Sequence, residues 1–121
     1  APAGLEMPVR ITADLRGMGA EIGETTDLVA AVGESDVVYM TRIQRERFDD
    51  PAEYERLKGS FVLTRELVEK AKKGIVVMHP LPRVDEITTD VDDLPNAAYF
   101  RQVANGVPIR MALLALVAGR E

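Results

Sequence analysis

Apolar residues near the N-terminus recur every three or four positions while charged residues occupy the positions between them. The apolar set is Leu5, Pro8, Ile11, Leu15 and Met18. This spacing predicts an amphipathic helix over residues 5–18, with the proline in its first turn. A short strand is predicted at residues 20–22. The next helix is expected to begin at a cap on Thr25 or Thr26 and to end at Gly33.

Two uninterrupted runs of β-forming residues, 36–41 and 75–78, predict strands that are buried on both faces of a parallel sheet. Between them, the pattern indicates a charged, solvated excursion with a helical turn near residues 51–57. A surface helix is then expected between Gly59 and Gly74. The alternation of helix and strand predicts the α/β class: an open parallel sheet flanked by helices in three αβα layers, resembling half of a Rossmann fold.

The C-terminal part reads as helical from about Asn96, with a predicted break at Asn105-Gly106 and with Pro108 in the first turn of a new helix. From Val107 to Ala118 the residues are apolar on all sides except at Arg110. A helix of this kind needs cover on every face, which a sheet of about three strands cannot give. Its partner is therefore expected in protein absent from this chain, or in a self-associating interface.

Composition narrows the function classes. The 121 residues suit one domain, and 46% hydrophobic with 29% charged residues indicates a globular protein. The longest apolar run is far below the roughly 20 residues that cross a bilayer, and no signal pattern opens the chain. We therefore expect no membrane partner and a cytoplasmic location.

A net charge of -5 disfavours a nucleic-acid surface. The absence of Cys and the single His exclude disulfides and Cys/His metal sites.

Two unusual loops follow the two long strands, where ligands bind in parallel sheets. Arg42 and Arg47, which follow the first strand, and Arg83, which follows the second, are candidates for forked hydrogen bonds to a carboxylate or phosphate. Gln44 adds an amide to the first loop. A salt-bridged surface loop is the alternative interpretation.

The second loop contains Pro80-Leu81-Pro82, which has one backbone N–H and several free carbonyls that can hold an amine. Its alternative is a tight turn that leaves the strand. His79 is the sole candidate for a general base, although a lone histidine at a strand end is more often structural.

Three segments carry a family resemblance: residues 38–47, residues 78–87, and residues 98–102 continued by Asn105-Gly106 and residues 110–115. In order and spacing they closely resemble the aspartate carbamoyltransferase family. The His-Pro-Leu-Pro form is similar to the aspartate-specific branch, whereas the ornithine branch typically has a cysteine at the position of Pro80.

The resemblance implies a transferase that moves the carbamoyl group of carbamoyl phosphate to the amine of L-aspartate, an early step of pyrimidine synthesis, without metal or organic cofactor. Arg42 and Gln44 would hold the aspartate side-chain carboxylate, and the carbonyls of Pro80 and Leu81 would position the amine and the carbamoyl group. Supporting roles would fall to Glu46, Arg47, a cis Leu81-Pro82 bond, Arg83 and Glu86. No catalytic base is expected in this chain.

The family's Ser-x-Arg-Thr phosphate cradle is absent from this sequence. We therefore expect that Ala1 falls inside the aspartate-binding domain (residues 1–104), and that residues 105–121 return to a carbamoyl-phosphate domain outside the chain. By resemblance the assembly would be based on a homotrimer, and the chain alone would bind aspartate weakly without turnover. Two alternatives are a non-catalytic assembly module and a generic nucleotide-binding half-fold. The latter is disfavoured because no G-x-G-x-x-G opens a helix.

Overall fold

The sheet of this protein is small, parallel and central. The computed structural model describes residues 1–120, without the side chain of Arg47. Strands β1 (Val37–Tyr39) and β2 (Val76–Met78) pair in parallel, with Val38 opposite Val77. Parallel pairing confirms the α/β class and brings the carboxyl ends of both strands to one edge of the sheet.

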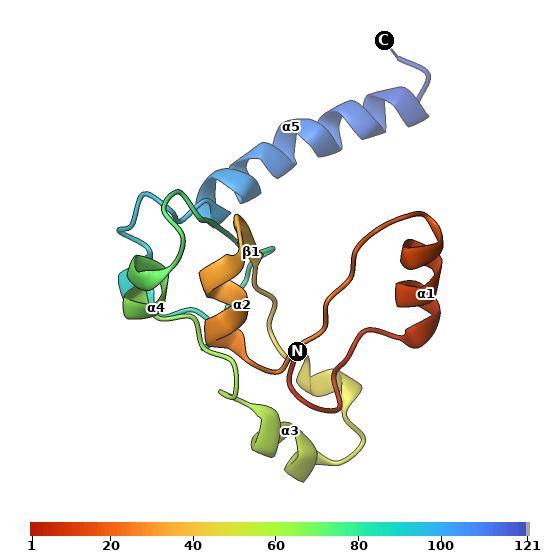
Figure 1. Ribbon diagram of the computed structural model, residues 1–121. Helices are drawn as coiled ribbons and strands as arrows, with labels where there is room; N and C mark the ends of the chain where they lie inside the picture. Colours follow the sequence, from red (N-terminus) through yellow and green to blue (C-terminus); the bar gives the residue numbers. More distant parts are fainter. Residues whose placement is uncertain (121) are drawn as a thin grey trace.

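Residues 1–120 contain five α-helices and two short 3-10 turns around this sheet. The helices are α1 (Val9–Gly17), α2 (Leu28–Glu34), α3 (Pro51–Leu57), α4 (Arg65–Lys70) and α5 (Tyr99–Val117), and the turns are η1 (Arg45–Arg47) and η2 (Thr89–Val91). Helix α2 packs against α4 beside the sheet, and the start of α5 contacts β2. Figure 1 shows α5 projecting from this body with the C-terminus at its far end, and α1 set apart on a long open loop.

The core lies around β2. Val77 donates its N–H to Asn96 O at 2.9 Å and accepts from Ala98 N at 2.8 Å, so β2 is flanked by β1 on one side and by this bridge on the other. A second bridge joins Leu63 to Ile87. The largest fully buried side chains are Tyr99, Leu63, Ile75, Ile87, His79, Val32, Val77 and Val91.

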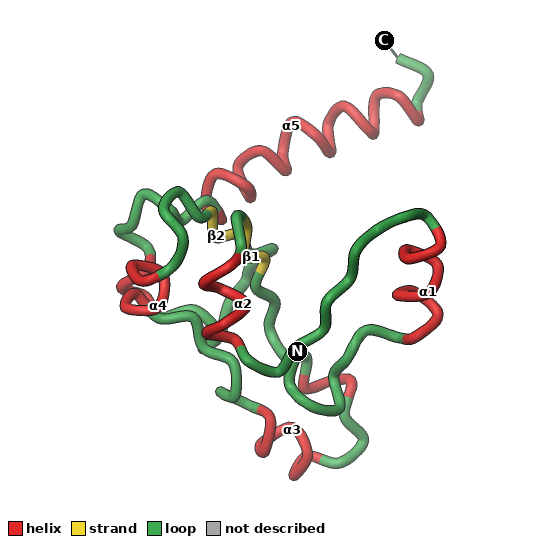
Figure 2. Tube along the Cα trace, in the orientation of Figure 1, coloured by secondary structure: helices red, strands yellow, loops and turns green. Residues whose placement is uncertain are grey.

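The strand predicted at residues 20–22 is wrong. The segment follows α1 as irregular chain, as the long loop in Figure 2 shows. Two of its backbone groups bond to the end of α1 instead of to a strand: Ala20 N–H donates to Leu15 O at 3.0 Å, and Ile22 O accepts from Arg16 Nη2 at 3.3 Å. A strand of three residues has no stability without a neighbouring strand.

The helix break predicted at Asn105-Gly106 is also wrong. Helix α5 runs without interruption from Tyr99 to Val117, with Pro108 inside it rather than in a first turn. An interior glycine costs about 1 kcal/mol and an interior proline about 3 kcal/mol. The helix-forming residues before Gly106 and after Pro108 outweigh these local costs.

Other boundaries also differ from the sequence pattern. Helix α1 is shorter than the predicted range 5–18, with Pro8 as its cap, and β1 is shorter than the predicted range 36–41. The cap of α2 is Asp27, whose carboxylate accepts from Ala30 N at 2.9 Å, while the hydroxyl of Thr25 accepts from Asp27 N. The helix expected between Gly59 and Gly74 is limited to α4, because Leu63 pairs its backbone with residues 86–88 instead. The helix at residues 51–57 is confirmed as α3, with Asp50 as its cap.

Apolar side chains line α5 but remain exposed. Those on its last three turns are Ile109, Met111, Leu113, Leu114, Leu116 and Val117, each more than half exposed. No helix among residues 1–120 is long and apolar enough to cross a membrane.

The contrast between core and α5 gives the first prediction. Leu63→Ala should lower the free energy of unfolding by roughly 2–5 kcal/mol, because it opens a cavity at a fully buried position. Leu114→Ala is the matched control, because Leu114 is 71% exposed, and it should change stability by less than about 0.5 kcal/mol. Urea unfolding monitored by circular dichroism measures both, and equal losses would contradict the assignment of the core.

Candidate functional site

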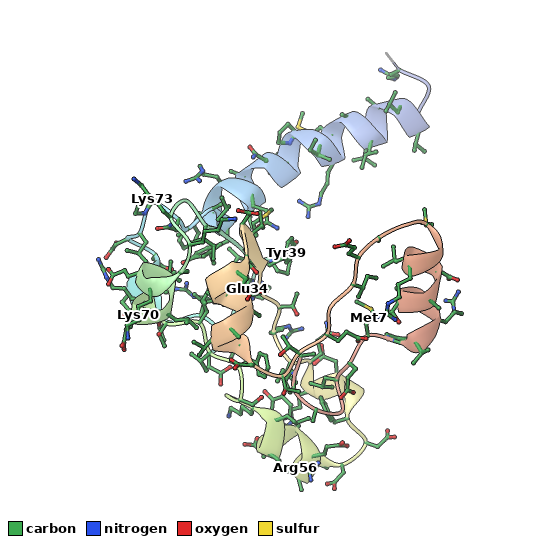
Figure 3. The ribbon with its side chains drawn as sticks, in the orientation of Figure 1. Met7, Glu34, Tyr39, Arg56, Lys70 and Lys73 are labelled. Atoms are coloured by element: carbon green, nitrogen blue, oxygen red, sulfur yellow. The ribbon has the colours of Figure 1, made fainter. Side chains whose placement is uncertain are left out.

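The loops that follow β1 and β2 border the same hollow. It is lined by Arg42 and Gln44 from the first loop, by the Pro80-Leu81-Pro82 segment from the second, and by residues near the N-terminus. Figure 3 shows two of its bordering side chains, Tyr39 on the β1 side and Met7 on the α1 side. Its volume of about 1650 Å³ exceeds the roughly 300–1,000 Å³ of a small-molecule pocket. The hollow therefore has room for covering protein as well as for a small ligand.

Arg42 lies on the rim of this hollow, partly exposed. Its Nη2 donates to Glu46 Oε1 at 3.0 Å across the start of η1. This pair occupies one of the five N–H groups of the guanidinium, which leaves a forked edge for an anion. Gln44 precedes η1 directly. The side chain of Arg47, expected to order this loop, lies outside the described residues.

The second loop has an unusual backbone that a buried histidine holds in place. The Leu81-Pro82 bond is cis, as expected from the family resemblance, and Leu81 has a φ of 49°. Leu81 N–H donates to His79 Nδ1 at 2.8 Å. This bond satisfies the loop's one free N–H, so the carbonyls of Pro80 and Leu81 are the backbone groups left for a ligand.

His79 is fully buried, and both ring nitrogens have partners. Because Nδ1 accepts from Leu81, the ring proton belongs on Nε2, which lies 2.6 Å from Glu86 Oε1. A histidine in this arrangement has no free lone pair to take a proton from a substrate. Its role in the geometry is to connect the loop to Glu86.

Glu86 accepts two further hydrogen bonds. Its Oε2 accepts from Val84 N at 3.0 Å and from Asp85 N at 3.1 Å. Burial raises the pKa of Glu86, but the backbone N–H groups and His79 that donate to its carboxylate outweigh burial, and the pKa lies below its usual range. Residues 79–86 thus form one hydrogen-bonded unit around an ionised carboxylate.

Arg83 pairs with a side chain of this chain, so its guanidinium is not left for a ligand. Its guanidinium forms a two-pronged pair with Asp92, with Nη2 2.6 Å from Oδ2, and it lies 5.6 Å from the centre of the Tyr99 ring. The hydrogen bonds from Arg83, and also from Tyr99, lower the pKa of Asp92 against the effect of burial. Burial, together with the Asp92 carboxylate, raises the pKa of the Tyr99 phenol to about 12. This cluster fixes the second loop to the start of α5.

Gln102 lies in the family-resembling segment 98–102, but no site role was predicted for it, although its side chain links the ends of the two strands. Its amide donates from Nε2 to Tyr39 Oη at 2.8 Å and accepts from His79 N at 3.1 Å through Oε1. One available signal was its spacing of three residues from Tyr99, which places both side chains on the same side of one helical turn.

Comparison with known proteins places this geometry in a family. A family model described as the Asp/Orn binding domain of aspartate/ornithine carbamoyltransferase matches residues 4–117. The chain is 55% identical to the aspartate carbamoyltransferase catalytic subunits of Methanopyrus kandleri over 120 residues and of Thermococcus gammatolerans over 119 residues. Each match covers 98% of this chain and 39% of the relative. The chain therefore spans about two fifths of the length of these relatives.

Solved structures agree with the sequence relatives. The catalytic subunit of M. jannaschii aspartate transcarbamoylase is similar with a TM-score of 0.82 and 49% identity, over 98% of this chain and 38% of that one. Aspartate transcarbamoylase from Trypanosoma cruzi in complex with carbamoyl phosphate and aspartate also has a TM-score of 0.82, with 38% identity over 94% of this chain and 38% of that one.

The hydrogen bonds of Glu86 predict a pH dependence of stability. Its folded pKa is below the unfolded value of about 4.3, so its contribution is complete above that value and is lost as the pH falls toward the folded pKa. Wild-type protein should therefore lose more of its free energy of unfolding between about pH 5 and pH 3 than Glu86→Gln does. The exposed Glu55→Gln should behave like wild type. Urea titrations across this range are the measurement, and parallel curves for wild type and Glu86→Gln would contradict the role of Glu86.

Proposed function

Because this chain belongs to the aspartate/ornithine carbamoyltransferase family, we propose that it supplies the aspartate-binding half of an aspartate carbamoyltransferase. The observation that carries this proposal is the shared hollow. An arginine and an amide suited to a carboxylate lie on one loop, and carbonyls suited to an amine lie on the other. Relatives named aspartate transcarbamoylase include a structure with carbamoyl phosphate and aspartate, which supports this pair of substrates.

The proposed reaction transfers a carbamoyl group in pyrimidine biosynthesis. The amine nitrogen of L-aspartate attacks the carbonyl carbon of carbamoyl phosphate and forms a tetrahedral intermediate. The bond from this carbon to the phosphate oxygen then breaks, and the departing phosphate takes the proton that the nitrogen loses. N-carbamoyl-L-aspartate and phosphate are released. No side chain of this chain forms a covalent bond, and no metal or organic cofactor takes part.

Each loop has one task in this reaction. Arg42 and Gln44 bind the side-chain carboxylate of aspartate with charge-assisted hydrogen bonds. The carbonyls of Pro80 and Leu81 accept from the amine and hold it toward the carbamoyl carbon. These residues catalyse the reaction by positioning the substrate, which can lower the activation barrier by several kcal/mol.

The supporting residues keep the loops in shape. Glu46, paired with Arg42, orders the first loop. The family resemblance assigns the same task to Arg47. Arg83 and Glu86 hold the second loop, in which Pro82 forms the cis bond. His79, with both ring nitrogens engaged, connects the loop to Glu86 rather than acting as a base.

The remaining half of the site lies in other protein. The exposed apolar residues of α5 fit an N-terminal carbamoyl-phosphate domain, on which residues 105–121 would pack beside the aspartate-binding domain of residues 1–104. We further propose a homotrimer-based assembly in the cytoplasm. This chain alone should bind aspartate weakly and should not turn over.

A chimera tests the function directly. The chain replaces the 120 matching residues of the M. kandleri catalytic subunit. Formation of carbamoyl aspartate by the chimera, and its absence with the chain alone, would support the proposal. A folded, correctly assembled chimera without activity would contradict it and would favour a non-catalytic assembly module.

Within that chimera, Arg42→Ala should lower kcat/KM for aspartate by on the order of 100-fold. The reason is the loss of two charge-assisted hydrogen bonds to the carboxylate. Arg45→Ala removes a guanidinium three positions along the same loop and should have an effect below about threefold. Steady-state kinetics measure both variants, and similar losses would show that Arg42 has no specific role.

A further inference from the structure

A single half-buried amide on α5 connects the ends of both strands. Gln102 donates to the Tyr39 hydroxyl at 2.8 Å and accepts the His79 N–H at 3.1 Å. The backbone N–H of His79 can only donate, so the amide oxygen must face it, and the NH₂ group is left for Tyr39. The orientation of the amide is therefore fixed by its two partners.

These partners stand at the start of the two ligand loops. Tyr39 is the last residue of β1, three positions before Arg42, and His79 directly follows β2 and precedes Pro80. Backbone pairing between the strands continues as far as the bond from Met40 N to Met78 O, at 2.9 Å. Among residues 1–120 no backbone hydrogen bond joins residues 41–44 to residues 79–83. Gln102 is thus the side-chain link across the sheet edge where the loops separate.

Gln102 is attached to a rigid part of the fold. It lies one turn after Tyr99, which is fully buried and bonded through its hydroxyl to Asp92. Asp92 in turn holds Arg83 at the far end of the second loop. A positioning group needs support of this kind, because small displacements of a ligand loop strongly reduce rate.

We propose that Gln102 is a positioning residue that sets the separation between the carboxylate-binding group, Arg42 with Gln44, and the amine-binding carbonyls of Pro80 and Leu81. This inference rests on the proposed function and deepens it. Through this separation, Gln102 favours a ligand that carries a carboxylate and an amine at one fixed spacing. Gln102 itself does not touch the substrate.

This role makes a prediction that general destabilisation does not make. Succinate has the carbon skeleton and both carboxylates of aspartate but no amine. A change in loop separation should therefore affect aspartate, which needs both loops at once, much more than succinate. If Gln102 had only a structural role, its substitution would weaken the binding of aspartate and of succinate equally.

The test uses the M. kandleri chimera described above. Gln102→Met keeps the length of the side chain but removes both hydrogen bonds. We expect the KM for aspartate to rise about 10-fold and kcat to fall about 10-fold, because the amine is misplaced. The inhibition constant of succinate, competitive with aspartate, should change by less than about threefold. An unchanged aspartate KM and kcat, or an equal loss for both ligands, would overturn the inference.

Two further variants separate the hydrogen bonds from the side-chain volume. Gln102→Glu retains acceptors for the His79 N–H and for the Tyr39 hydroxyl, which can donate, so most of the activity should return. Val103→Ala, at the exposed next position of α5, should leave the kinetics unchanged. Failure of the Gln102→Glu rescue together with a loss in Val103→Ala would indicate a general effect on α5 and would overturn the role.

Tyr39→Phe tests the same link from the other strand. Tyr39 is 53% exposed, so loss of its hydroxyl should leave folding intact even where a Gln102 variant does not fold. It should raise the aspartate KM about threefold while succinate is unaffected, and it should add nothing to Gln102→Met in the double variant. Full additivity would contradict action through this bond.

The two proposals fail in different ways. An active chimera in which these variants behave like the parent would remove the role of Gln102 and leave the proposed function intact. An assembled chimera that forms no carbamoyl aspartate would remove the proposed function, and the positioning role would fall with it.

Discussion

The parallel pairing of β1 with β2 is the constraint on which the rest of the site depends. With Val38 opposite Val77, both strands end at the same edge of the sheet, and a loop follows each of them there. The side chains after β1 and the carbonyls after β2 then border one hollow although about 40 residues of sequence separate them. A slip of one residue would exchange the buried and exposed faces of a strand and redirect the residue that begins each loop. Few residues fix this register, so the bridges and side-chain bonds around it matter more than they would in a larger sheet.

The second loop shows how a short segment is held in one shape without regular secondary structure. Its hydrogen bonds pass from Leu81 through the His79 ring to the Glu86 carboxylate, which also accepts backbone N–H groups of its own turn. Every buried polar group in this set has a partner, which is the condition under which a buried network rigidifies a site. A lone histidine beside a substrate loop invites assignment as a base. Here its occupied nitrogens make it part of the scaffold, in agreement with the proposed reaction, in which these residues act by positioning.

Much of this arrangement followed from local sequence, and the misses have physical causes. Uninterrupted apolar runs identified both strands, and their order along the chain predicted the shared edge. The predicted burial on both faces is wrong for β1, where only Val38 is buried and Val37 and Tyr39 are about half exposed. The segment at 20–22 has β-compatible residues but no neighbour to pair with, a fact that only tertiary structure holds. The glycine and proline of α5 were overweighted, because local propensity is a weak guide inside a long helix. Gln102 was missed because its partners are 23 and 63 residues away, and no local pattern encodes such a link.

In the proposed function, one loop binds the side-chain carboxylate of an amino acid and the other loop binds its amine. A crystal structure of the M. kandleri chimera with carbamoyl phosphate and succinate tests it most directly. We expect one succinate carboxylate to lie within about 3 Å of the Arg42 guanidinium. The methylene next to the other carboxylate, which corresponds to the amine-bearing carbon of aspartate, should face the carbonyls of Pro80 and Leu81. Succinate bound elsewhere, or bound with Arg42 directed away from it, would contradict the account.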